Sequence, residues 1–219
     1  MRTCLIAALA ATLLVGSPTT AAEPTTTASA TGRPDQGTQL SKLREGDFSV
    51  DLKALRREHG STQWEEAKNQ FAKLETAPDE ALSAARKQLD EDWLTPEAHL
   101  VAEIALSRLS RKDEAAKHHV FLLAWLRSVT GDRDGLTAAT AWNATSVNEE
   151  YFALMLMGRQ AEGQSLVNSK DGVFDVMHTT DRKSGAKGDI WFDISSFYGK
   201  EFGLGSASAR PVDPALQGR

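Results

Sequence analysis

The sequence predicts an α+β protein that is mostly α-helical, with helical hairpins first and an antiparallel β-hairpin or small sheet at the C-terminal end. Three observations lead to this fold class. Apolar residues recur every three or four positions through the first two-thirds of the chain. Two helical segments align at an offset of 34 residues, and the apolar pattern changes to alternation after residue 172.

Length and composition indicate one globular domain. The chain has 219 residues, of which 41% are hydrophobic and 25% charged, as is typical of globular proteins. The formal net charge of −5 argues against a nucleic-acid partner, because phosphate binding depends on an excess of Lys and Arg.

The N-terminal 22 residues have the pattern of a secretory signal peptide. Arg2 precedes an apolar run over Leu5–Val15, and Thr20-Ala21-Ala22 supplies small residues for cleavage. The run is too short to span a membrane stably, so we expect no transmembrane span after cleavage. We expect export, to the periplasm or beyond the cell. Cleavage would also remove Cys4, the single cysteine of the chain.

Composition divides the remainder into three parts. Residues 23–40 are rich in Thr, Ala, Gly and Pro, and we expect a flexible linker there. Residues 41–205 are expected to form the globular domain, helical over 47–168 and a β-hairpin over 173–197. Residues 206–219 are expected to be a flexible tail.

The helical part divides into segments with recognisable starts and apolar stripes. Pro78 and Pro96 each suit the first turn of a helix. The stripes predict helices over about 52–60, 64–74, 78–93, 96–109, 112–129, 138–142 and 149–157.

Two of these helices begin alike. Pro78–Leu89 aligns with Lys112–Leu123 at an offset of 34, which is the period of tetratricopeptide helix pairs. The alignment places Ala81 and Ala115 where two helices of a pair would cross closely. We therefore expect helical hairpins that are loosely tetratricopeptide-like. An unrelated helical bundle is the alternative, because a solenoid needs about three repeats and only two are visible.

The C-terminal segments alternate as strands do. Val173–Thr180 and Asp189–Ser196 carry β-branched and aromatic residues around a polar, Gly-containing turn. A lone hairpin is marginal in water, so we expect this one to pack on the helices or to gain a strand.

Several short motifs occur together in the C-terminal half. They are Gly131-Asp132, Glu149-Glu150-Tyr151, Gln164-Ser165-Leu166 and Phe192-Asp193-Ile194-Ser195. Their order and spacing resemble a bacterial family called domain of unknown function 4919, over about residues 47–203. The N-terminal half departs from the family pattern. The resemblance implies a small exported protein and carries over no catalytic residue.

The same half supplies a speculative binding surface. It consists of polar residues near a helix start and on the hairpin, namely Glu149, Glu150, Tyr151, Asp175, Asp193 and Ser195. Acids at a helix start already have a structural explanation in the helix dipole. The alternative is a hydrolase of envelope polymers that uses the carboxylates near 149–150 and 175 or 193, which would need a defined separation across a cleft.

Histidines and serines suggest two other kinds of chemistry. His99 with Glu103, and Glu114 with His118, have helical i,i+4 spacing, but a metal site needs more converging ligands. We expect no metal and no cofactor, with His119 packed inside and His118 facing solvent. A Ser/His/Asp arrangement would combine His178 with Asp193 and Ser195 or Ser196. No GxSxG elbow supports it, and we expect these serines to serve turns.

The absence of a complete catalytic motif favours a non-enzymatic function. We expect an exported interaction module that binds an envelope or periplasmic protein. The alternatives are the envelope-polymer hydrolase and a periplasmic immunity or inhibitor protein.

Overall fold

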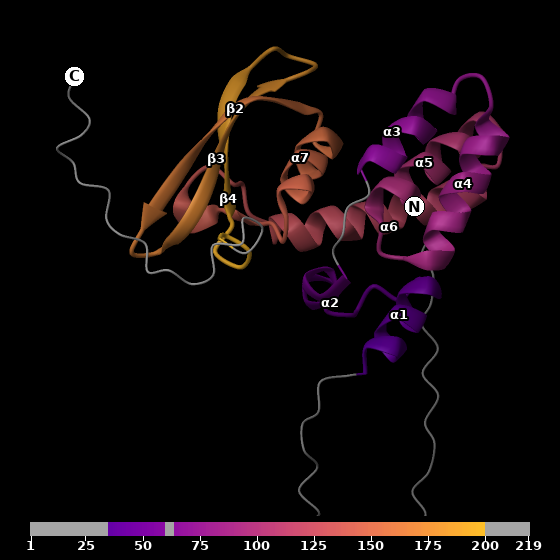
Figure 1. Ribbon diagram of the computed structural model, residues 1–219, viewed down its shortest axis with the longest axis horizontal. Helices are drawn as coiled ribbons and strands as arrows, with labels where there is room; N and C mark the ends of the chain where they lie inside the picture. Colours follow the sequence, from indigo (N-terminus) through magenta and orange to yellow (C-terminus); the bar gives the residue numbers. More distant parts are fainter. Residues whose placement is uncertain (1–34, 60–63, 200–219) are drawn as a thin grey trace, which may run out of the picture. The chain divides into compact units, whose positions relative to one another are not determined.

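The computed structural model describes residues 35–59 and 64–199. They form an α+β structure that is mostly helical, with the sheet after most of the helices, as the sequence predicts (Figure 1). The helices are α1 (Gln36–Arg44), α2 (Leu52–His59), α3 (Trp64–Lys73), α4 (Pro78–Glu91), α5 (Pro96–Arg108), α6 (Lys112–Thr130), the 3-10 turn η1 (Ala138–Thr140) and α7 (Val147–Leu156). The strands are β1 (Trp142–Asn143), β2 (Arg159–Ser169), β3 (Gly172–Asp181) and β4 (Lys187–Asp193).

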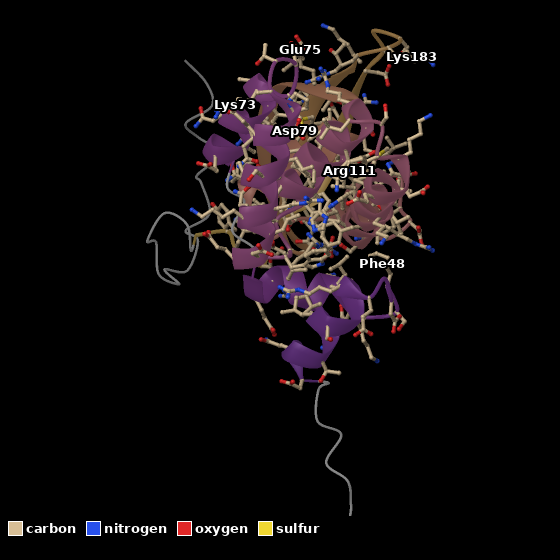
Figure 2. All side chains as sticks on the ribbon, turned by 90° about the vertical axis from the view of Figure 1, so that its right-hand side faces the viewer. Phe48, Lys73, Glu75, Asp79, Arg111 and Lys183 are labelled. Atoms are coloured by element: carbon tan, nitrogen blue, oxygen red, sulfur yellow. The ribbon has the colours of Figure 1, made fainter. Side chains whose placement is uncertain are left out.

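Helices α3 to α6 pack as successive neighbours and form two helix pairs. Ala81 in α4 and Ala115 in α6 are both buried in the core that these helices share. Small residues at these two equivalent positions let the helices approach closely, as the 34-residue offset predicts. The outer faces carry charged side chains such as Lys73, Glu75 and Asp79 (Figure 2).

Helix α6 belongs to two cores. It has 19 residues, so it is about 28 Å long. Its first half places Ala115 in the core of the helix pairs, and its second half places Phe121, Trp125 and Val129 in a second core. The second core also contains residues of α1, α2, α7 and the sheet. Figure 1 shows α6 running from the helix pairs to the sheet.

The sheet has the strand order β1-β4-β3-β2. β3 is antiparallel to both β2 and β4, and β1 is parallel to β4. The β3–β4 pair confirms the predicted hairpin. On one face, Met177, Ile190 and Phe192 pack into the second core. The hairpin thus gains both the additional strands and the helix packing that its marginal stability requires.

Strand β2 contradicts the prediction of helix over 47–168. It pairs along β3 and most of its residues are exposed. An edge strand that buries few side chains shows little apolar alternation, so its pattern does not reveal it. Pairing with β3 determines its conformation.

Helix α1 corrects the end of the linker predicted over 23–40, of which residues 23–34 lie outside the described residues. Residues 36–40 are helical, and Leu40 and Leu43 pack against the second core. Polar composition suggested a flexible chain, but two leucines on one helical face are enough to anchor it. The predicted signal peptide over 1–22 and the predicted tail over 206–219 lie outside the described residues.

None of the helices in the described ranges combines the length and the hydropathy that are needed to cross a bilayer.

Candidate functional site

The six residues of the speculative binding surface do not form one surface. Three of them are buried: Glu149 and Glu150 have exposed fractions of 2% and 0%, and Asp175 one of 5%. Burial raises the pKa of Asp175. These three carboxyl groups belong to the interior of the fold.

Glu149 is a structural residue. Its Oε2 accepts a 2.6 Å ion-pair hydrogen bond from Arg56 of α2 and a 2.8 Å bond from the backbone N–H of Thr145. Arg56 also donates to the backbone carbonyls of Ser128 and Asn143, at 3.0 and 3.3 Å. The pair therefore ties α2, α6, β1 and α7 together.

The other three predicted residues have different hydrogen-bond partners from this pair. Asp193 and Ser195 line a polar cavity of about 280 Å³ with Lys53 and Arg57. The Ser195 hydroxyl accepts from the backbone N–H of Val173 at 3.0 Å, and Asp193 accepts from the N–H of Ser195. Ser195 therefore serves a turn. Tyr151 is exposed on α7, and its hydroxyl donates to Gln164 at 3.3 Å.

This arrangement weakens the carboxylate hydrolase. A glycosidase needs two carboxyl groups that face an open cleft. Of the four acids that the hypothesis uses, Glu149, Glu150 and Asp175 are buried, which leaves Asp193.

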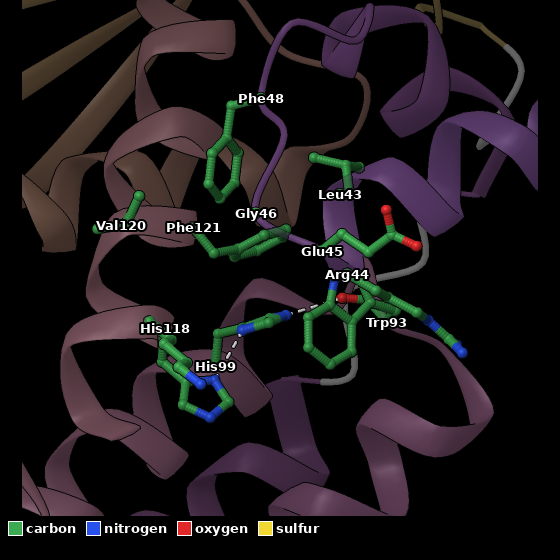
Figure 3. Close-up of a pocket in the computed structure, with 11 residues that line it drawn as sticks. Leu43, Arg44, Glu45, Gly46, Phe48, Trp93, His99, His118, Val120 and Phe121 are labelled. Atoms are coloured by element: carbon green, nitrogen blue, oxygen red, sulfur yellow. Dashed lines mark hydrogen bonds between the residues drawn. The ribbon is translucent and has the colours of Figure 1, made fainter. Parts of the chain in front are cut away.

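A more substantial site lies between α1, α5 and α6. It is a cavity of about 330 Å³, within the size range of small-molecule pockets (Figure 3). Its walls come from α1 and the segment after it, from the α4–α5 connection, and from α5 and α6: Leu43, Arg44, Glu45, Gly46, Phe48, Trp93, His99, Lys117, His118, Val120 and Phe121. Aromatic and aliphatic side chains predominate among them.

Local sequence explains how these walls come together. Gly46 has a φ of 86°, a left-handed conformation that glycine adopts without strain. It ends α1 and turns the chain so that Phe48 lines the same cavity as Val120 and Phe121 of α6. On the opposite wall, Pro96 begins α5, and His99 lies on its first turn.

His99 is fixed on every side. Its ring stacks on Phe121, with centroids 3.7 Å apart and planes at 17°, and meets the edge of Trp93 at 4.8 Å. Its Nε2 is 2.8 Å from the backbone carbonyl oxygen of Trp93, and its Nδ1 is 2.9 Å from Nδ1 of His118 (Figure 3). Burial lowers the pKa of His99 to about 3, so its imidazole is neutral at pH 7.

These contacts fix both tautomers. A carbonyl oxygen can only accept, so Nε2 of His99 carries the proton. Nδ1 of neutral His99 is then an acceptor, and Nδ1 of His118 must donate to it. Burial lowers the pKa of His118 as well. In the neutral form its Nε2 is therefore an unprotonated acceptor, and it has no hydrogen-bond partner within residues 35–59 and 64–199.

Three charged side chains line the cavity. Arg44, Lys117 and Glu45 line the cavity, so cations outnumber anions there. The Arg44 guanidinium also lies over the Trp93 ring, 5.5 Å from its centroid. The site thus offers apolar walls, one hydrogen-bond acceptor and an excess of positive charge.

The histidine expectations from sequence are reversed. His118 is partly buried against His99, whereas His119 is exposed and lies 2.9 Å from Glu103. Both contacts cross from α6 to α5. The antiparallel packing of these helices determines which residues of α5 contact His118 and His119. The i,i+4 spacing within a single helix does not reveal these contacts. In the described segments no three His, Cys, Asp or Glu side chains are grouped to hold a metal ion.

No family model, curated protein or solved structure matches this chain. The family resemblance therefore stays a prediction from sequence motifs.

Proposed function

We propose that this protein is an exported binding module for a small amphipathic organic anion. The observation that carries the proposal is the cavity beside α6, in which a neutral imidazole of fixed tautomer accompanies aromatic walls. Concave apolar pockets with a few converging polar groups and perturbed pKa values are the usual places where ligands bind.

The lining defines the chemistry of the ligand. Phe48, Val120 and Phe121 favour an apolar or aromatic body. Nε2 of His118 accepts a hydrogen bond, so the ligand should carry a donor such as a hydroxyl group. Arg44 and Lys117 favour a carboxylate or a similar anion.

Export is part of the proposal. It rests on the signal-peptide pattern of residues 1–22. In this proposal, the expected envelope or periplasmic protein partner binds either to the ligand-loaded cavity or to the outer surface of the helices.

A pair of probe molecules tests the site. We would titrate the protein with 4-hydroxyphenylacetate and with phenylacetate, which lacks the hydroxyl donor, and measure affinity by calorimetry and by NMR shifts of the histidines. His118→Phe keeps a ring but removes the acceptor. A neutral hydrogen bond contributes about 1 kcal/mol, so we expect about fivefold weaker binding of 4-hydroxyphenylacetate and unchanged binding of phenylacetate.

The charge contribution is tested separately. Lys117→Gln should weaken both probes equally, and Lys112→Gln, an exposed residue of the same helix outside the cavity, should weaken neither. Equal losses of both probes in His118→Phe would contradict the role of Nε2. Absence of binding at millimolar concentrations would contradict the proposed ligand class.

A further inference from the structure

Three polar side chains form a hydrogen-bonded chain across three adjacent strands of the sheet. Ser165 on β2 has its Oγ 2.9 Å from Nε2 of His178 on β3. Nδ1 of His178 is 2.8 Å from Oδ1 of Asp189 on β4. The sequence suggests that His178 would pair with Asp193 and with Ser195 or Ser196. Both serines bond elsewhere, Ser195 with the backbone of Val173 and Ser196 with the backbone of Ala144.

Strand register brings the three residues together. His178 is directly opposite Asp189 in the β3–β4 pairing. In the β2–β3 pairing, Ser165 is opposite Val176, two residues from His178 and on the same face. A β-bulge lies between Ala161 and Gly163, and Gly163 is the residue opposite His178. Bulges are frequent beside active sites because they redirect side chains.

The proton positions follow from the partners. The Asp189 carboxylate can only accept, so Nδ1 of His178 donates to it. Nε2 of the neutral imidazole then accepts the proton of the Ser165 hydroxyl. This is the order of groups in an activated serine: a nucleophile, a general base, and a carboxylate that fixes the tautomer of the base.

We propose that Ser165 is a nucleophile for acyl transfer from carboxylic esters, with His178 as its base and Asp189 as the positioning residue. The Ser165 Oγ forms a bond to the acyl carbon while its proton passes to Nε2 of His178. The ester C–O bond breaks, and the leaving alcohol takes that proton. Water then attacks the acyl carbon and gives a proton to Nε2 of His178. The bond between the acyl carbon and Ser165 Oγ breaks, and Oγ takes the proton back from His178, so the products are a carboxylic acid and free Ser165.

The surroundings limit the substrate class. The His178 and Asp189 side chains are 46% and 54% exposed, so the ester must be one that reaches an open sheet face. Trp191 and Val176 are opposite each other in the next row on that face. Val176 is buried there, and the partly exposed Trp191 offers an apolar contact for an acyl or aromatic group. Esters carried on a larger molecule fit this open site, and the small activated esters used as probes also reach it.

The alternative is a polar ladder that only stabilises the exposed face. Cross-strand side-chain pairs of this kind stabilise a sheet modestly. Reactivity at Ser165 separates the two readings, because a ladder requires no reactive serine.

The experiment treats the full chain with a fluorophosphonate and with p-nitrophenyl acetate. Peptide mapping by mass spectrometry locates the label, and release of nitrophenolate gives the acylation rate. We expect label on Ser165 and none after Ser165→Ala. General-base catalysis contributes about 10²–10⁴-fold, so we expect His178→Gln to slow acylation about 100-fold and Asp189→Asn to slow it less.

A matched control is Ser169→Ala, at the end of the same strand, where the hydroxyl bonds only within the β2–β3 turn. It should leave the label and the rate unchanged. The proposal is overturned if Ser165 is not labelled above Ser169, or if His178→Gln leaves the rate unchanged. A lower melting temperature in the variants without any labelling of the unmodified protein would identify the ladder and also overturn the proposal. These outcomes at Ser165 do not affect the separate proposal that the cavity between α1, α5 and α6 binds a ligand.

Discussion

At the residue scale, the first turn of α5 places two buried titratable groups with opposite effects on stability. His99 is held neutral, with a pKa of about 3. Two residues earlier, burial raises the pKa of Glu97 to about 7, with the nearby charges of Glu149 and Asp92 adding to the shift. Neither carboxyl oxygen of Glu97 has a hydrogen-bond partner within the described part of the chain.

The tautomers of the histidine pair are directly observable. We expect long-range ¹H–¹⁵N NMR spectra at pH 7 to show His99 with its proton on Nε2 and His118 with its proton on Nδ1, because the Trp93 carbonyl can only accept. A His118→Phe variant assigns the signals. A spectrum in which both rings carry the proton on Nε2 would contradict the hydrogen-bonded chain and remove the free acceptor from the cavity.

Glu97 should make folding stability fall as pH rises. Its pKa is about 7 in the folded protein and about 4.3 when unfolded. The folded state therefore binds the proton more tightly, and stability is lost between about pH 4.5 and 7. Glu97→Gln removes this loss. We expect the variant to gain roughly 3 kcal/mol relative to the unmodified protein between pH 4 and pH 8, measured by urea unfolding.

The same variant should reveal the opposite slope of His99. The pKa of His99 is lowered from about 6.5 to about 3, so the unfolded chain binds its proton first as the pH falls. Stability then decreases below about pH 6.5. In the unmodified protein this slope and that of Glu97 offset each other between about pH 4.5 and 6.5. A Glu97→Gln curve that is flat through that interval would show that His99 is not held neutral.

At the element scale, the Arg56–Glu149 pair joins α2 to α7, and the residues around it belong to α6 and β1. Buried ion pairs are costly to break from one side, because the remaining charge has no partner. We expect Arg56→Met alone, or Glu149→Leu alone, to lower the free energy of unfolding by about 3–5 kcal/mol. The double variant should be less destabilised than the sum of the two, as measured by denaturant unfolding.

Additive losses would contradict this coupling, since independent sites add and contacting ones do not. A matched control is the exposed pair of Lys73 and Glu80, 3.3 Å apart. Exposed pairs contribute little, so Lys73→Met should change stability by less than about 1 kcal/mol.

Elements also mark the limit of prediction from sequence. Helices with a strong apolar stripe, such as α4 and α6, and the β3–β4 hairpin are predictable because local periodicity matches burial. Strand β2 is not predictable, because its mostly exposed residues show no clear pattern and its conformation depends on pairing with another strand, β3. The cavity likewise depends on tertiary packing and not on local sequence. Nothing in the sequence distinguishes His99 and His118 from other helix residues, and only the antiparallel packing of α5 and α6 brings their Nδ1 atoms together.

At the scale of the whole molecule, α6 couples the two cores. Ala115 lies in the core of the helix pairs and Trp125 in the core with the sheet, and one unbroken helix contains both. Neither core can lose its packing on α6 without disturbing the helix that supports the other. The described domain should therefore unfold in one cooperative transition, as small single domains usually do.

One large-to-small substitution in each core tests this coupling. Leu82 lies in the core of the helix pairs and Leu154 in the core with the sheet, and Leu→Ala at a buried site costs about 2–5 kcal/mol. We expect either variant to shift the far-UV and near-UV circular dichroism transitions together. Far-UV signal reports mainly the helices, and near-UV signal reports the aromatic residues of the second core, such as Trp125 and Phe152. If Leu82→Ala moved the far-UV midpoint and left the near-UV midpoint in place, the cores would be independent and α6 would not transmit stability between them.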